Sequence, residues 1–122
     1  NITGTVVVNG EKKNLNGQID RLVVEDETVW IVDYKSNAKI PETDAQTPDI
    51  YVAQMAAYKH IIQQIYPDKA VKTVLLWTRA PKLQVLKNEQ LNEISRKMGL
   101  NTFNDERVIK LPRPGTQKSN KR

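Results

Sequence analysis

Residues 17–36 constrain the fold more than any other part of the chain, because two apolar runs rich in β-branched residues flank a short acidic tip. This pattern predicts a β-hairpin. If residues 26–27 form a two-residue turn, the pairing that follows places Asp20 directly opposite Asp33. Because side chains alternate along a strand, Lys35 shares the face of Asp33. The hairpin therefore gathers two carboxylates and one ammonium group on one face.

Such a cluster has the composition of a hard-cation site. Two carboxylates that face each other across a sheet repel, and a divalent cation would remove this cost. Oxygen ligands from Asp20 and Asp33, with the main-chain carbonyl of Tyr34 nearby, suit Mg²⁺, which binds one or two carboxylates and keeps several waters. Lys35 beside the metal would orient an attacking water or stabilise developing negative charge. These are the parts that phosphodiester hydrolysis needs.

Simpler explanations of the same residues stay open at this point. Two acids and a lysine on a hairpin are often solvated surface charge, or a cross-strand ion-pair patch of small energetic value. Asp-Glu is also an unfavourable sequence for a type I′ turn, and a longer loop would shift the pairing. Burial favours the metal site, because apolar residues flank both acids and a buried, unpaired carboxylate is costly.

The composition excludes several kinds of chemistry. A chain of 122 residues fits about one domain. It contains no cysteine, which excludes disulfides, thiolate-bound zinc and iron–sulfur clusters of the usual kind. The single histidine, His60, excludes a zinc site built on paired histidines within this chain. Without a signal peptide or an apolar run long enough to cross a membrane, the chain is expected to be soluble and cytoplasmic.

The net charge of +5 is concentrated near the C-terminus, where the last twelve residues carry four Lys or Arg and no acid. We therefore expect one domain over residues 1–100 and a basic, largely disordered tail over 101–122. A basic tail suits nucleic acid, and a solubilising terminus explains it equally well. The sequence has no Walker A loop, so this chain alone should not hydrolyse ATP.

The rest of the chain predicts an α/β order of elements. Beyond the hairpin, the sequence predicts strands at 5–8 and 12–15, a helix at 47–66, strands at 71–78 and 83–86, and a helix at 88–98. Thr47 is expected to cap the first helix, with Pro48 at its first position, and Asn88 to cap the second. Both faces of the hairpin are largely apolar, which predicts cover on both sides.

Several single residues have more than one possible role. Gln54 and Tyr58 share a face of the first helix. Gln54 could fix the substrate or a metal-bound water, or be plain polar surface, and Tyr58 could contact DNA or pack beneath the site. His60 is predicted to be an exposed helix residue. Trp30 and Trp77 are predicted to be core residues rather than platforms for bases.

Three short motifs stand in a recognisable order, namely GQIDR at 17–21, IVDYKS at 31–36 and QMAAY at 54–58. Together they resemble the G-x-x-D-R, D-Y-K-[ST] and Q-x-x-x-Y motifs of the RecB-like nucleases in the PD-(D/E)XK superfamily. The continuation over 75–86 is similar to the C-terminal end of the AddA subunit of bacterial helicase–nucleases. The resemblance covers about residues 15–90 and does not reach the basic tail.

This resemblance implies a restriction-endonuclease-like α/β fold, in which helices flank a mixed central sheet. It also implies a DNA nuclease that depends on Mg²⁺, with Mn²⁺ as a substitute. The catalytic set would be Asp20, Asp33, Lys35 and Gln54, and the metal ligands would be Asp20, Asp33 and the main-chain carbonyl of Tyr34. The residues that contact DNA or support the site would be Tyr58, Arg21 and Ser36.

The resemblance further implies a larger assembly. In it, an ATP-driven helicase part would feed linear duplex ends or single strands to this domain during double-strand break processing. The partner would be a second, AddB-like helicase–nuclease subunit, and the activity would be that of an exonuclease. No membrane association is implied.

One feature departs from the family pattern. Such nucleases usually carry an upstream helix whose histidine completes the metal site, and no residue precedes Asn1 to supply it. The sequence therefore predicts either a C-terminal piece of a longer protein or a degenerate site. Two rival functions follow, namely a catalytically inactive nuclease-like module that binds DNA or docks a subunit, and a small α/β interaction domain with accidental charges.

Overall fold

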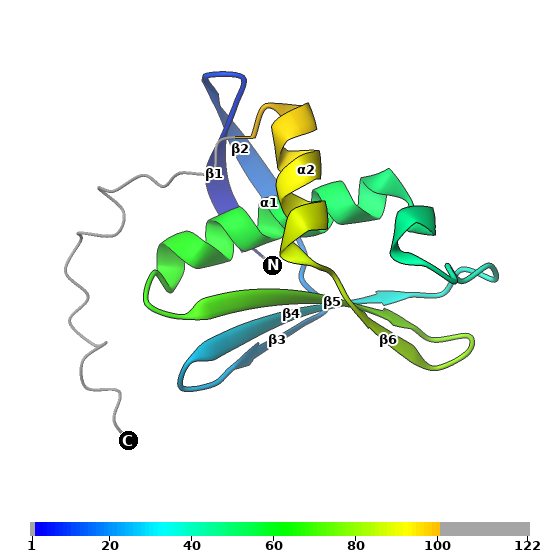
Figure 1. Ribbon diagram of the computed structural model, residues 1–122. Coiled ribbons are helices and arrows are strands. Elements are labelled where there is room, and N and C mark those ends of the chain that lie inside the picture. The colour runs from blue at the N-terminus through cyan, green and yellow to red at the C-terminus, as the bar shows by residue number, and fades with distance from the viewer. Residues whose placement is uncertain (1, 101–122) are drawn as a thin grey trace.

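The computed structural model describes residues 2–100, and its centre is a mixed four-stranded sheet in the order β3-β4-β5-β6 (Figure 1). The central strands β4 and β5 are parallel, and each outer strand is antiparallel to its neighbour. In chain order the elements are β1 (Ile2–Val8), β2 (Glu11–Gly17), β3 (Arg21–Val24), β4 (Thr28–Lys35), η1 (Asp44–Gln46), α1 (Asp49–Ile65), β5 (Ala70–Trp77), β6 (Lys82–Val85) and α2 (Asn88–Met98). Every strand and helix expected from the sequence is present.

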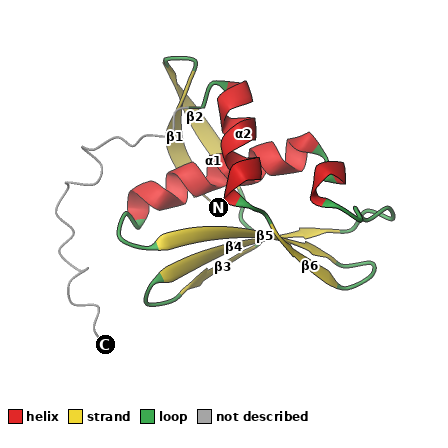
Figure 2. Cartoon of the chain, in the orientation of Figure 1, coloured by secondary structure: helices red, strands yellow, loops and turns green. Residues whose placement is uncertain are grey.

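Helix α1 lies between the four-stranded sheet and a separate β1–β2 hairpin, and α2 packs beside α1 (Figure 2). Gly4 of β1 approaches α1 so closely that an added Cβ would lie 2.8 Å from the side chain of Ile61. The core fills the space between α1 and the sheet, and its most deeply buried large side chains are Ile31, Met55, Leu75 and Trp77. Helix α1 therefore packs between the β1–β2 hairpin and the face of the sheet that carries Asp33.

The predicted register of the β3–β4 hairpin is confirmed. Arg21 pairs with Val32 and Val24 pairs with Val29, so the alternation expected for Asp33 and Lys35 holds. The main-chain N–H of Glu25 donates to the carbonyl of Thr28 across 2.8 Å, which leaves residues 26–27 as the turn. Neither turn residue has a positive φ, so the turn is not of type I′.

The side chain of Lys69 explains how an unfavourable turn sequence is tolerated. Its ammonium group donates to the carbonyls of Glu25 and Asp26, each across 2.7 Å. The N–H of Ala70 donates to the carbonyl of Glu27 across 2.9 Å. The start of β5 thus holds the tip of the hairpin from outside, which no local turn rule could anticipate.

The prediction that the hairpin is covered on both faces was wrong for the described residues, because both helices lie on the same side of the sheet (Figure 2). Alternation places Trp30 and Tyr34 of β4 on the other face, with Leu83 and Val85 of β6. Tyr34 is 46% exposed and Leu83 is 67% exposed. Apolar residues on both faces of the hairpin therefore do not imply that helices pack on both faces. Trp30 is only half-buried there, whereas Trp77 is a core residue as predicted.

The helix caps differ from the prediction by one residue each. Pro48, not Thr47, is the N-cap of α1, and the hydroxyl of the buried Thr47 instead accepts a hydrogen bond from Gln84 across 2.8 Å. Lys87, not Asn88, is the N-cap of α2. Asn88 instead accepts a hydrogen bond from Lys59 across 3.0 Å. In both cases a partner distant in sequence takes the side chain that local capping rules would use.

His60 is half-buried in α1, so its predicted exposure was wrong. Burial lowers the pKa of His60 to about 4, and the nearby charge of Lys59 acts in the same direction. His60 is therefore a neutral helix residue at pH 7.

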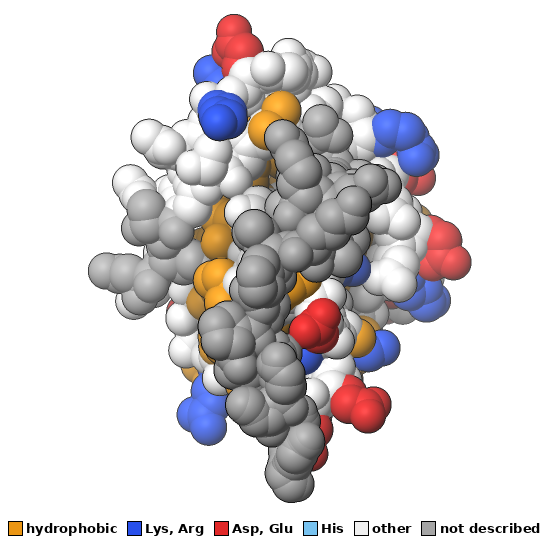
Figure 3. All heavy atoms as spheres, turned by 90° about the vertical axis from the view of Figure 1, so that its left-hand side faces the viewer, with side chains coloured by type: hydrophobic (Ala, Val, Ile, Leu, Met, Phe, Trp, Pro, Cys, Tyr) orange, Lys and Arg blue, Asp and Glu red, His pale blue; other side chains and the backbone are white. Residues whose placement is uncertain are grey.

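The surface of the described part carries charges of both signs. On the face seen in Figure 3, acidic and basic side chains lie interspersed around the margin, with apolar side chains among them. The predicted basic tail at 101–122 lies outside the described residues. No helix within residues 2–100 is long and apolar enough to span a membrane.

Candidate functional site

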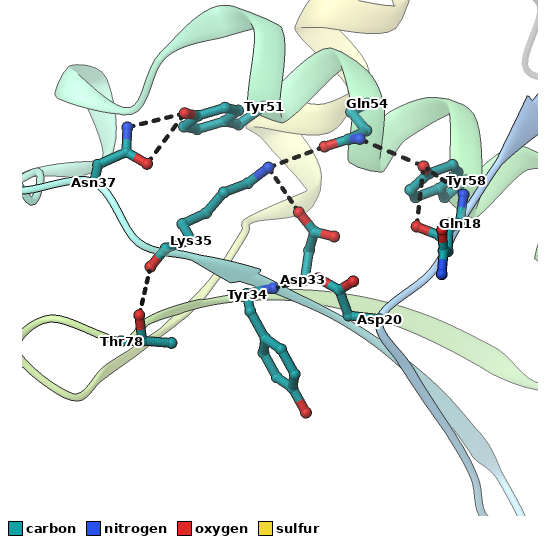
Figure 4. A network of polar contacts seen from close by, with 10 residues as sticks. All are labelled: Gln18, Asp20, Asp33, Tyr34, Lys35, Asn37, Tyr51, Gln54, Tyr58 and Thr78. Carbon is teal, nitrogen blue, oxygen red and sulfur yellow. Dashed lines mark hydrogen bonds and ion pairs between the residues drawn. The ribbon is translucent and has the colours of Figure 1, made fainter.

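The four predicted catalytic residues and Tyr58 meet where the end of β4 passes beneath α1 (Figure 4). Asp33 and Lys35 point to the helix side of the sheet, because residues two apart on a strand share a face. Gln54 and Tyr58 reach down from α1, one helical turn apart. Asp20 comes from the segment just before β3. Strand β4, the segment before β3 and helix α1 therefore bring together residues from three separate parts of the sequence.

A buried ion pair forms the centre of the cluster. Oδ2 of Asp33 lies 2.7 Å from the ammonium nitrogen of Lys35, and the two side chains are 8% and 13% exposed. Burial raises the pKa of Asp33 above its usual 3.8, and the hydrogen bond and charge of Lys35 oppose this rise. The carboxylate is thus held in an environment that does not fully compensate its negative charge.

The pairing of β3 with β4 ends at Arg21 and Val32, and the preceding residue, Asp20, lies close to Asp33 (Figure 4). Oδ2 of Asp20 accepts a hydrogen bond from the main-chain N–H of Tyr34 across 2.8 Å, which fixes the exposed carboxyl group at the end of β4. Asp20 also contributes to the raised pKa of Asp33, so the two carboxyl groups interact electrostatically. The side chain of Tyr34 points away from the cluster, so only its main chain belongs to the site (Figure 4).

Gln54 connects the ion pair to Tyr58. Its Oε1 accepts a hydrogen bond from Lys35 across 3.2 Å, and its Nε2 donates to the hydroxyl of Tyr58 across 3.4 Å. The same hydroxyl donates to the carbonyl of Gln18 and accepts from the N–H of Gln18, both across 3.3 Å. The network therefore runs from the ion pair through α1 to the main chain just before Asp20.

Tyr58 packs beneath the site, which was one of its two predicted roles. It is 5% exposed, and its ring fills the space next to Gly17. A Cβ at Gly17 would lie 2.6 Å from both Cε1 and the hydroxyl oxygen of Tyr58. The glycine of the first motif and the tyrosine of the third are therefore complementary parts of one contact.

Two of the proposed DNA-contacting residues lie at the edge of the cluster or outside it. Arg21 pairs with Val32, so its side chain belongs to the face of the sheet opposite Asp33. Ser36 is exposed and follows Lys35, and its carbonyl accepts a hydrogen bond from Arg79 across 3.1 Å. The roles given to Arg21 and Ser36 stay predictions.

Sequence reasoning missed two residues of the cluster. The ring of Tyr51 lies against the ammonium group of Lys35, 3.9 Å from nitrogen to ring centroid, and Asn37 bonds to the Tyr51 hydroxyl. Neither the motifs nor the charge pattern gave Tyr51 a role at the site. The available signal was its position one turn before Gln54, which places both residues on the same face of α1.

The donor set fits a hard divalent cation with many water ligands. Within residues 2–100 no group of three or more His, Cys, Asp or Glu side chains is placed to hold a metal. Asp20 and Asp33 remain as a carboxylate pair, and Mg²⁺ typically takes one or two carboxylates and fills its other positions with water or phosphate oxygens.

The sequence matches the profile of the PD-(D/E)XK nuclease superfamily over residues 3–117. The chain therefore belongs to this superfamily, and its mixed sheet with two helices is the restriction-endonuclease-like fold. The match extends beyond the 15–90 range in which the motifs lie. Searches among curated proteins and among solved structures found no match to this chain.

The contact between Gly17 and Tyr58 gives a first prediction. Gly17→Ala should destabilise the fold by about 1–3 kcal/mol in urea unfolding, because the ring is buried and hydrogen-bonded and cannot move aside easily. In a Tyr58→Leu background the same change should cost much less, since the clashing atoms are gone. An equal cost in both backgrounds would show that the clash is not the cause.

The raised pKa of Asp33 gives a second prediction, for the metal-free protein in EDTA. The folded chain holds the Asp33 proton more tightly than the unfolded chain, so this contribution to stability is complete below pH 3.8 and is lost as the pH rises through the raised pKa. The stability of the wild type should therefore fall relative to that of Asp33→Asn as the pH rises through the raised pKa. Urea unfolding of both proteins between acidic pH and pH 7 measures this difference in stability. Asp68→Asn makes the same change at an exposed loop position and is the matched control.

Proposed function

We propose that this chain is the nuclease domain of an AddA-type helicase–nuclease and hydrolyses DNA phosphodiester bonds with the help of Mg²⁺. The observation that carries the proposal is the buried Asp33–Lys35 pair facing Asp20, on the strand end that the superfamily pattern would make catalytic. The order of the three motifs supports the finer assignment to the RecB-like branch.

The chemistry follows from the positions of the polar groups. Asp20 and Asp33 would hold the metal ion through their carboxylate oxygens, with the carbonyl of Tyr34 as a further ligand. A bound divalent ion would lower the pKa of a coordinated water and neutralise charge on the phosphate. Lys35 would donate to the attacking water or to a non-bridging phosphate oxygen, where negative charge develops.

The reaction is an addition of water across one ester bond. The water oxygen forms a bond to phosphorus while the bond from phosphorus to the leaving oxygen breaks. The leaving oxygen takes up the proton that the water loses, so one DNA end becomes a phosphate monoester and the other a hydroxyl. Gln54 keeps Lys35 in place during this exchange through its 3.2 Å hydrogen bond.

The wider context is part of the same proposal. A helicase part outside this chain would use ATP to feed linear duplex ends or single strands to the site. The partner would be a second, AddB-like helicase–nuclease subunit, and the basic residues at 101–122 would add phosphate contacts. Exonuclease action would follow if access to the site requires a free DNA end.

A second candidate function is DNA binding or subunit docking without cleavage. The observation that favours it is the limited donor set, because residues 2–100 provide only the Asp20 and Asp33 carboxylates at this position and no cluster of three potential ligands. Lys35 also already occupies one oxygen of Asp33. Under this alternative, DNA binding would fall steeply with salt and would not respond to magnesium.

The test is a cleavage assay with Mg²⁺ or Mn²⁺ on end-labelled linear duplex, single-stranded and covalently closed circular DNA. Cleavage of linear but not circular DNA is expected, and EDTA should abolish it. Asp33→Asn and Lys35→Met should each reduce the rate by roughly 10²-fold or more, because each removes charge from the reacting centre. Asp68→Asn and Lys12→Met are matched controls at exposed positions and should cut like the wild type.

Two results would contradict the proposed function. If Asp33→Asn cuts at the wild-type rate, the cleavage does not come from this site. If the wild type binds DNA in a salt-dependent way but never cuts it with either metal, the binding function replaces the catalytic one.

A further inference from the structure

The ammonium group of Lys35 is enclosed on three sides. Asp33 and Gln54 accept its hydrogen bonds across 2.7 and 3.2 Å, and the face of Tyr51 lies 3.9 Å away on the third side. An ammonium group within about 6 Å of a ring centroid is attracted by the negative ring face. The ring therefore attracts the cation without competing for its protons.

Tyr51 is itself held from two directions. Its hydroxyl accepts a hydrogen bond from Nδ2 of Asn37 across 2.9 Å and donates to Oδ1 of the same residue across 3.3 Å. Its ring leans on the fully buried Trp77, with centroids 6.1 Å apart and planes at 55°. Asn37 follows Lys35 by two residues, and Trp77 pairs with Lys35 in the sheet. The two residues that support the Tyr51 ring therefore lie at the ends of β4 and β5, next to the backbone of Lys35.

Trp77 is anchored in turn. Its indole N–H donates to Oε1 of Gln84 across 3.0 Å, and Nε2 of Gln84 donates to the hydroxyl of Thr47 across 2.8 Å. This chain of contacts ends next to the first residues of α1, the helix that carries Tyr51. The Tyr51 ring that contacts Lys35 is therefore held in place by buried residues of the core.

We propose that Tyr51 is a positioning residue, whose ring face holds the Lys35 ammonium group against Asp33 and Gln54. This inference rests on the proposed nuclease function, in which Lys35 acts at the reacting phosphate. A lysine side chain is a flexible four-carbon chain, and ordering it in one rotamer has a large entropic cost. The Tyr51 ring removes the direction in which the ammonium group could swing away from the metal site.

The placement of Lys35 can be measured without any activity assay. Protons above an aromatic ring experience its ring current, so the ε-methylene signals of Lys35 in NMR spectra of the full chain should lie upfield of ordinary lysine signals. Tyr51→Phe keeps the ring and should keep the shift. Tyr51→Leu keeps apolar packing on Trp77 but removes the ring, and the signals should return to ordinary values. Tyr66→Leu, at the far end of α1, is the matched control and should leave the Lys35 signals unchanged.

The catalytic consequence is measured with the same variants. Tyr51→Leu should lower kcat roughly tenfold, as expected for loss of one cation–π contact on a reacting group, with the KM for DNA unchanged. Tyr51→Phe should retain kcat within about threefold, because the ring face and not the hydroxyl holds the cation. This rescue by phenylalanine separates positioning from a hydrogen-bonding role.

The outcomes distinguish the two proposals. An ordinary wild-type Lys35 signal, or a signal that Tyr51→Leu leaves in place, overturns the role of Tyr51 whether or not the chain cuts DNA. Equal defects in Tyr51→Phe and Tyr51→Leu also overturn it, as does a loss confined to KM. If the wild type cuts no DNA, the nuclease function fails, while the NMR shift still decides whether Tyr51 positions Lys35.

Discussion

The buried ion pair between Asp33 and Lys35 is the interaction on which the rest of the site depends. Taking a carboxylate and an ammonium group out of water is costly, and their mutual attraction repays that cost only when further polar contacts complete the environment. Gln54 and Tyr51 supply such contacts to the ammonium group. Burial raises the pKa of Asp33, the hydrogen bond and charge of Lys35 oppose this rise, and Asp20 adds to it. A buried carboxylate with a shifted pKa beside a specific charged partner is a pattern found at many functional sites.

The central hairpin could be predicted from the sequence because its information is local. Strand alternation has a period of two, so one correct turn assignment fixes the partner and the face of every residue along the hairpin. The turn assignment alone predicts Asp20 opposite Asp33, with Lys35 on the same face as Asp33. Helical spacing did the same for Gln54 and Tyr58. The family motifs predict that the hairpin and the helix share one site. The structure shows the hydrogen bond from Lys35 to Gln54 that joins them.

The features that could not be predicted depend on contacts between residues far apart in sequence. Thr47 and Asn88 are good caps by local rules, yet each bonds to a partner on another element. The ring face of Tyr51, on α1, lies against the ammonium group of Lys35. Neither strand nor helix periodicity specifies that contact. Cover on both faces of the hairpin was inferred from apolar residues alone, although periodicity cannot reveal which face a helix will occupy. Local patterns thus gave the register and the faces, while packing decided the partners.

The measurement that tests the central claim most directly is a crystal structure of the full chain soaked with Mn²⁺, with diffraction data collected at an energy where manganese scatters anomalously. The account predicts an anomalous peak between Asp20 and Asp33, at coordination distance of about 2.1 Å from carboxylate oxygens of both residues. The same soak of Asp33→Asn should give no peak at this position. A wild-type map without a peak there, with Asp33 still paired to Lys35, would contradict the account and leave the hairpin as a structural ion pair.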